Sequence, residues 1–77
     1  MTLPEENFAQ YFSAVLKNLG HSQVYLAALA NIHPTRISKV KNGSLIPDKG
    51  TVAAWAKCWG ISSVETQKLQ RLLDQSR

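Results

Sequence analysis

The sequence predicts an all-α fold, a compact domain of five short helices, and three observations lead to this prediction. Apolar residues recur at intervals of three and four along most of the chain, which is the spacing of one buried helix face. No segment alternates apolar and polar residues for long enough to suggest a strand. Glycine and proline occur singly, where one helical pattern ends and the next begins. Because 44% of the 77 residues are apolar, we expect residues 1–77 to form a single domain with one modest core.

The first two expected helices lie on either side of Gly20. The first ends at Gly20, since glycine readily adopts the left-handed conformation that ends a helix. Its apolar face consists of Phe8, Phe12, Val15, Leu16 and Leu19. The second begins after Ser22, a good N-cap, and ends at Asn31, which also tolerates the left-handed conformation. Its apolar residues are Leu26, Ala27, Leu29 and Ala30.

The third expected helix opens with His33 as the cap and Pro34 at the first helical position. Proline is favoured there because its missing N–H has no partner within the helix. Ile37 and Val40 are the apolar residues of this helix, and Gly43 closes it.

The last two expected helices also carry clear start signals. Asp48 can cap the fourth, which ends at Gly60, and its inward residues are Val52, Trp55, Ala56 and Trp59. Ser62 and Glu65 have the spacing of a capping box at the start of the fifth. The apolar edge of the fifth helix consists of Leu69, Leu72 and Leu73. We expect the two tryptophans to supply much of the buried area.

Positive charge is concentrated in the middle of the chain. Nine Lys and Arg against five Asp and Glu give a net charge of +4. The segment from His21 to Gly50 carries four basic residues and one acidic residue, a net of +3. A basic central segment in a small domain is typical of a protein that binds a polyphosphate, although such a charge run is also compatible with a merely solvated helix face.

Several classes of protein are excluded by composition and spacing. A single cysteine, Cys58, cannot form an intramolecular disulfide framework, and with two histidines it cannot complete a structural zinc site. The uncharged stretch 18–35 is interrupted by polar residues and is no membrane span, and residues 1–7 lack the basic start of a secretory signal. The sequence also lacks paired carboxylates, a nucleophile with a base at usable spacing and a Gly-rich phosphate loop, which argues against an enzyme. We therefore expect a cytoplasmic protein with no cofactor, metal or small-molecule ligand.

The segment 22–43 reads SQVYLAALANIHPTRISKVKNG, a helix, a tight turn and a second helix in succession. It resembles, without a gap, the helix-turn-helix of the lambda-repressor-like family, the XRE/Cro/CI type of bacterial and phage transcriptional regulators. The matching positions are Ser22-Gln23, Leu26-Ala27, Ile32, Ile37-Ser38 and Gly43. Residues 52–62 look like the fourth helix of that family, so the resemblance covers about two thirds of the chain.

The third helix has the face that base recognition needs. With about 100° per residue, Ile37 and Val40 mark the buried side, and Thr35, Ser38, Lys39 and Asn42 lie opposite. Short hydrogen-bonding side chains and a lysine can enter the major groove, where lysine donates to guanine O6 and N7. Together with the resemblance, this predicts base readout by Pro34, Thr35, Ser38 and Lys39. The residues expected to contact phosphates are Ser22, Gln23, His33, Arg36, Lys41 and Asn42.

This chain departs from the family pattern at a few positions. The family commonly pairs a glutamate with an arginine where this chain has Lys41 and Leu16, so we expect that ion pair to be absent and Lys41 to be free for a phosphate. His21 replaces an apolar residue and is expected to be partly buried. Cys58 is expected to be a packed thiol beside Trp59.

The resemblance implies a Cro/CI-like repressor, bound to double-stranded DNA of the nucleoid as a homodimer on a roughly palindromic operator. Half-sites would lie about 10 bp apart, centre to centre. The alternative is an antitoxin or another protein-binding module whose main partner is a protein. Leu69, Leu72 and Leu73 either fold back onto the first helix or form a dimer or partner contact, and the sequence favours a mixture of both.

Overall fold

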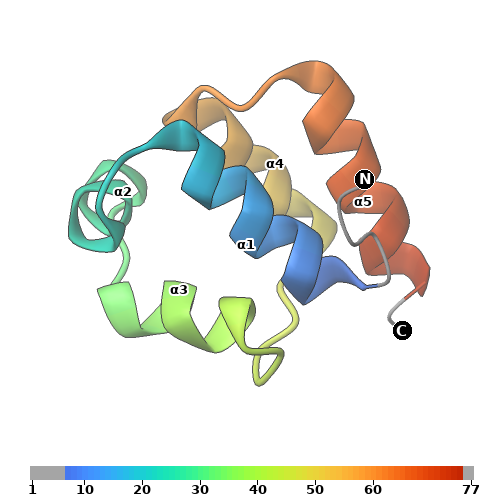
Figure 1. Ribbon diagram of the computed structural model, residues 1–77, viewed down its shortest axis with the longest axis horizontal. Helices are drawn as coiled ribbons and strands as arrows, with labels where there is room; N and C mark the ends of the chain where they lie inside the picture. Colours follow the sequence, from blue (N-terminus) through green and yellow to red (C-terminus); the bar gives the residue numbers. More distant parts are fainter. Residues whose placement is uncertain (1–6, 76–77) are drawn as a thin grey trace.

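The structure is a computed structural model that describes residues 7–75, and it confirms the all-α prediction for this part of the chain. Its elements are α1 (Phe8–Leu19), α2 (Gln23–Ala30), α3 (Pro34–Lys41), α4 (Lys49–Trp59) and α5 (Ser63–Gln75). In Figure 1, α1 lies across the front of α4, α5 lies to one side, and α2 and α3 form the opposite side and the lower edge. No helix among the described residues has both the length and the apolar character that crossing a bilayer requires.

Side-chain caps begin the helices where the sequence predicts them. Ser22 Oγ accepts from the Tyr25 N–H at 3.1 Å, and Asp48 Oδ1 accepts from the Thr51 N–H at 2.7 Å. Ser62 Oγ accepts from the Glu65 N–H at 3.3 Å and donates to the Glu65 carboxylate at 3.1 Å. This capping box therefore closes through the Ser62 hydroxyl.

The turn between α2 and α3 has the expected left-handed residue. Asn31 has φ 57° and ψ 46°, the conformation that glycine adopts at this point in many helices. α3 ends at Lys41, slightly before the predicted end, because Asn42 serves as its C-cap and Gly43, at φ 85°, turns the chain away.

The core is formed by all five helices, and its centre is aromatic. Phe12 lies 6.0 Å from Trp55 and 6.1 Å from Trp59, measured between ring centroids, and the two tryptophans stack at 5.3 Å. The Trp59 indole N–H donates to the Leu26 carbonyl at 2.8 Å, a buried bond that ties α4 to α2. The core placement of both tryptophans is thus confirmed, and α4 packs against α2.

The leucines of α5 belong to this core. Leu69, Leu72 and Leu73 are 1%, 6% and 0% exposed. The expectation that they fold back into the domain is confirmed, and their second expected role needs correction. Side chains that are already enclosed by their own chain have no surface left for a second copy or a partner.

Two further expectations about burial, those for Cys58 and His21, were wrong, and one apolar residue of α2 lies outside the core. Leu29 is 44% exposed, because it lies about 110° around α2 from the centre of the face formed by Leu26, Ala27 and Ala30. Cys58 is exposed, because it lies about 120° from the buried face of α4. His21 is also exposed, and its ring lies 4.8 Å from that of Tyr25.

Candidate nucleic-acid interface

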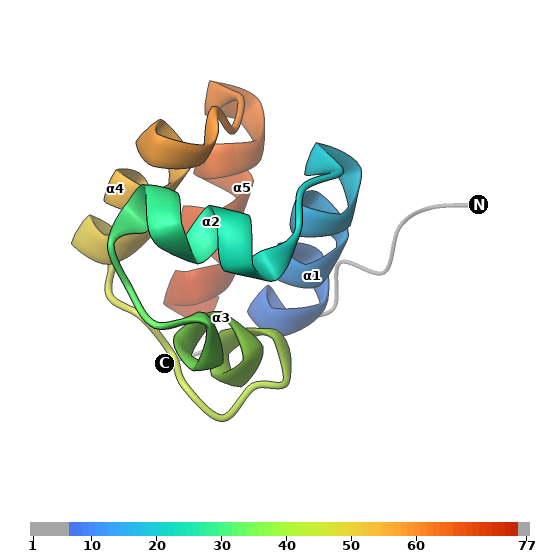
Figure 2. The ribbon, with the colours of Figure 1, turned by 90° about the vertical axis from the view of Figure 1, so that its left-hand side faces the viewer.

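α2 and α3 form a crossed pair that is joined by one polar side chain. Figure 1 shows α3 lengthwise and α2 nearly end-on, and Figure 2 shows the reverse. The Gln23 side-chain amide donates to the Pro34 carbonyl at 3.0 Å and to Ser38 Oγ at 2.5 Å. Ile37 and Val40, both 0% exposed, fix the other side of α3 in the core. The pair is therefore held by apolar contacts from within and by Gln23 at its outer edge.

The outer face of α3 is polar, basic and open. Thr35, Arg36 and Lys39 are exposed, and together with His33 and Leu45 they line a shallow hollow of about 580 Å³. The structure thus brings two of the four residues predicted to read bases, Thr35 and Lys39, to one accessible surface. Leu45 lies beyond α3, and no signal in the sequence links it to this surface.

The other two predicted base-reading residues are less accessible. Pro34 and Ser38 are half-buried on the side of α3 that faces α2. The Ser38 hydroxyl accepts a hydrogen bond from Gln23, so its own proton remains available to a base acceptor such as guanine N7. Pro34 has no donor, so it can contribute only shape or an apolar contact.

Capping side chains around α2 and α3 use their acceptor atoms and keep donors for a ligand. His33 Nδ1 accepts from the Thr35 N–H at 3.1 Å, which leaves the proton of the neutral ring on Nε2. Asn42 Oδ1 accepts from the Ser44 N–H at 2.9 Å, which leaves its amide N–H groups. Ser22 caps Tyr25 and likewise keeps its hydroxyl proton. Since phosphate oxygens only accept hydrogen bonds, these three donors suit the predicted phosphate contacts.

Gln23 differs from these residues. Its Nε2 has two N–H groups, and the two bonds to α3 occupy both of them. The remaining Oε1 is an acceptor, as is a phosphate oxygen, so this side chain cannot donate to DNA without leaving α3. The structure gives Gln23 a positioning role and leaves its main-chain N–H, at the positive end of α2, as the group able to face a phosphate.

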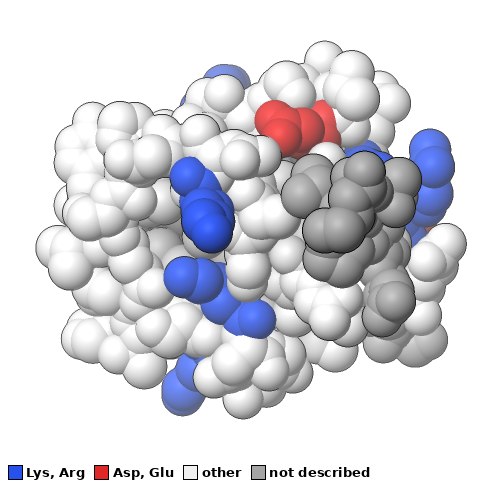
Figure 3. All heavy atoms as spheres, viewed as in Figure 1, with Lys and Arg blue, Asp and Glu red and all other residues white. Residues whose placement is uncertain are grey.

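The charge of this surface is uniformly positive. Arg36, Lys39 and Lys41 are all exposed, and no carboxylate of residues 7–75 lines the hollow beside α3. Figure 3 shows blue side chains in a line from the end of α1 across to α3, whereas the red ones visible in this view lie over the start of α5. Lys49 and Asp74 form an ion pair at 2.8 Å on a different part of the surface, between α4 and α5.

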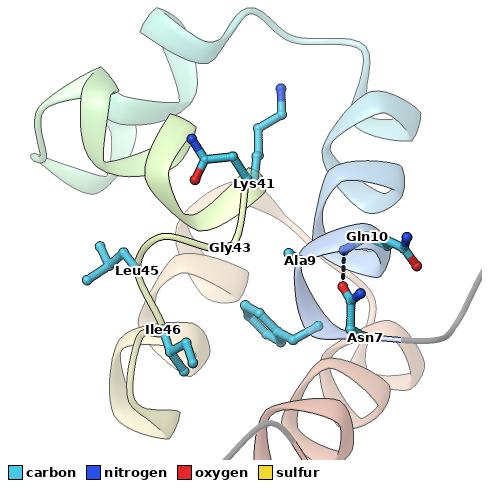
Figure 4. A pocket seen from close by; sticks show the side chains of 9 residues that line it. Asn7, Ala9, Gln10, Lys41, Gly43, Leu45 and Ile46 are labelled. Carbon is cyan, nitrogen blue, oxygen red and sulfur yellow. Dashed lines mark hydrogen bonds between the residues drawn. The ribbon is translucent and has the colours of Figure 1, made fainter.

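Lys41 takes no part in an ion pair with α1. Leu16 stands on α1 where the family commonly has the arginine of this ion pair. Its side chain is apolar and buried, with 5% of its surface exposed. A hollow of about 380 Å³ separates the start of α1 from the loop after α3. Leu45 and Ile46 line one end of this hollow, and Figure 4 shows the Lys41 side chain pointing away from that end, toward the space between α1 and α2. The Lys41 ammonium group is thus available to an anion.

Comparison with known protein families supports what the geometry suggests. The family model described as helix-turn-helix matches residues 13–65, which include α2, α3 and α4 completely. Searches of curated proteins and of solved structures give no match.

Proposed function

Because the chain belongs to the XRE-type, lambda-repressor-like family of helix-turn-helix DNA-binding regulators, we propose that it is a Cro/CI-like repressor. In this proposal it binds a roughly palindromic operator as a homodimer, with α3 in the major groove of each half-site. The observation that carries the proposal is the outer face of α3, where Thr35 and Lys39 are exposed among basic side chains and no described carboxylate is present.

The dimensions of α3 agree with this role. α3 has eight residues and so is about 12 Å long, and the major groove is about 12 Å wide and admits one helix. In the groove, Lys39 would donate to guanine O6 and N7, and Thr35 would bond to a base edge or contact a thymine methyl group. Arg36, Lys41 and the capping donors would hold the helix against the flanking phosphates.

Dimerisation follows from the small size of this reading surface. A helix with two or three side chains at base edges distinguishes only a few base pairs, and a single small module buries too little surface for operator selectivity. Two copies on half-sites about 10 bp apart would double the sequence that is read. Since the α5 leucines are enclosed in the core, the dimer contact belongs to another surface of the domain.

The alternative, a protein-binding module, is weakened by the same burial. Its proposed contact was the leucine edge of α5, and those side chains are at most 6% exposed. A toxin or other protein partner would therefore need a different surface of the domain.

Selection from a random pool of double-stranded DNA tests the proposal. We expect enrichment of a two-fold symmetric site, with a Kd that rises steeply with salt because several phosphate contacts release counterions. Sedimentation with the selected site should give two chains per duplex. An asymmetric site that binds one chain would contradict the dimer, and the absence of any enriched sequence would contradict the repressor.

A further inference from the structure

A second polar hollow lies outside the face of α3, where the end of α1 meets the start of α2 and the end of α3. Its volume is about 300 Å³, roughly ten times the share of one liquid water molecule. Its polar lining comes from Ser13, Lys17, His21, Gln23 and Lys41. We call it the junction pocket.

Positive charge in the junction pocket is not compensated within the described residues. Lys17 and Lys41 both line it, and no Asp or Glu of residues 7–75 does. Its floor is apolar, since Leu16 and Leu26 line it and are 5% and 1% exposed. Two ammonium groups that share one hollow repel each other, and an apolar floor offers them no counter-charge, so an anion in the hollow would be attracted by both.

Neighbouring side chains hold the walls of the junction pocket in place. The Ser13 hydroxyl shares its one proton between the carbonyls of Ala9, at 3.0 Å, and Lys41, at 3.4 Å, which links the end of α3 to α1. The His21 ring packs on Tyr25 in the first turn of α2. The Gln23 side chain is fixed by its bonds to α3. The lysine side chains and the His21 ring N–H are thus the donors that remain for a ligand.

We propose that the junction pocket binds a phosphate group of the DNA backbone, with Lys17, His21 and Lys41 as its donors. This inference rests on the proposed DNA binding and adds Lys17 and His21, which lie outside the predicted helix-turn-helix segment 22–43. The pocket is continuous with the proposed interface, because Lys41 ends α3 and Gln23 begins α2. It would clamp the backbone beside the groove that α3 enters, at the end of α3 opposite to His33.

Lys17→Gln tests the proposal against a closely matched control, Lys57→Gln. Lys17 and Lys57 each lie in the last turn of a helix that ends at a left-handed glycine, Gly20 and Gly60. The two substitutions therefore remove the same charge from the same local setting, but Lys57 lines a different hollow, between α4 and α5. Circular dichroism and thermal unfolding should be alike for both variants.

The measurement is the salt dependence of binding to a mixed-sequence duplex, which needs no known operator. The slope of log Kobs against log salt is negative, and one lost phosphate contact should make it less steep by about 0.9. This is equivalent to about eightfold weaker binding at about 0.1 M salt. We expect this loss for Lys17→Gln, a smaller loss for His21→Gln, and less than about a twofold change for Lys57→Gln. Equal slopes for Lys17→Gln and Lys57→Gln would overturn the proposal.

Titration of the ¹⁵N-labelled protein with inorganic pyrophosphate separates this inference from the proposed function. We expect amide shifts at the ends of α1 and α3 and at the start of α2, weakened in Lys17→Gln. If the wild-type protein binds no duplex even at low salt, the proposed function fails, and pyrophosphate shifts at the pocket would then identify a site for a free phosphate and overturn its assignment to DNA. If the duplex binds steeply but Lys17→Gln behaves as its control does, the DNA-binding function stands and the junction pocket is refuted.

Discussion

Replacing Trp59 tests how α4 supports α2, the first helix of the helix-turn-helix. The Trp59 side chain is 5% exposed, stacks on Trp55 and donates its indole N–H to the Leu26 carbonyl of α2. Trp59→Phe keeps an aromatic ring in the core but removes the donor, whereas Trp59→Ala removes the ring as well. We expect both variants to be less stable, the alanine variant severely so.

The losses of stability expected for Trp59→Phe and Trp59→Ala have different physical causes. Without the indole donor, the Leu26 carbonyl keeps its bond within α2 but loses a second, buried hydrogen bond, which costs about 0.5–1.5 kcal/mol. That loss would lower the Tm of a domain of this size by about 4–8 °C per kcal/mol. Truncation to alanine opens a cavity beside Phe12 and Trp55 and costs about 3–5 kcal/mol. Because a 77-residue domain has a total stability of only about 4–12 kcal/mol, the alanine variant should be unfolded in a large fraction of its molecules.

Urea unfolding followed by far-ultraviolet circular dichroism measures both losses without relying on tryptophan fluorescence. Cys58→Ala is the matched control, since Cys58 is the adjacent residue of α4 but is exposed, and its stability should change by less than about 0.5 kcal/mol. A Trp59→Phe variant that unfolds at the wild-type urea concentration would refute the contribution of the Leu26 bond. A stable Trp59→Ala variant would refute the placement of Trp59 in the core.

Three further predictions concern DNA contacts and pH. Lys39→Ala should weaken operator binding by about 1–3 kcal/mol and relax selectivity at one base position; a loss that is equal for all sequences in a competition assay would argue against base readout. Lys41→Ala should weaken specific and non-specific binding alike and lower the salt slope by about one, so an unchanged slope would remove Lys41 from the phosphate contacts. Burial, and secondarily the negative charge of Glu65, raise the pKa of Tyr11 above its usual 10.0. A pKa that is raised in the folded state adds stability that is complete below the unfolded-state pKa and is lost as pH rises through the folded-state value. The free energy of unfolding should therefore fall above about pH 10, and less so in Tyr11→Phe, as urea midpoints at neutral and alkaline pH would reveal; the same fall in both proteins would contradict this role of Tyr11.

The helices and their ends were predictable because their signals are local. Asp48, Ser22 and His33 cap helices through bonds to residues two or three positions away, and such bonds depend only on short stretches of sequence. Asn31 and Gly20 likewise end helices by their own backbone preference. The fold class therefore followed from the sequence, with small differences such as the end of α3 at Lys41.

Burial at the edge of a helix face was harder to predict, because it depends on where neighbouring helices cross. Leu29 and Cys58 are exposed, because each lies more than 100° around its helix from the centre of the buried face. Tyr11, which the expected face of α1 did not include, is 6% exposed and packs beneath Lys68 of α5, whose Nζ lies 5.1 Å from its ring centroid. A contact of this kind joins residues that are far apart in the chain, so the periodicity of one helix cannot indicate it.

In the candidate site, too, local features could be predicted from the sequence and contacts between helices could not. The residue types on α3 were predictable from helical spacing, but the atoms that remain available were not, since these depend on bonds between helices. Gln23 gives both of its amide N–H groups to α3, a use that no local pattern signals. It follows that a substitution such as Gln23→Ala would act on DNA binding by loosening α2 from α3, even if Gln23 never touches a phosphate. The same reasoning applies to Lys17 and Lys41, which are 24 positions apart in the sequence and line one hollow only because α1 packs against α3. A basic residue in a helix-turn-helix chain is thus better judged by the hollow it shares than by whether it lies in the motif.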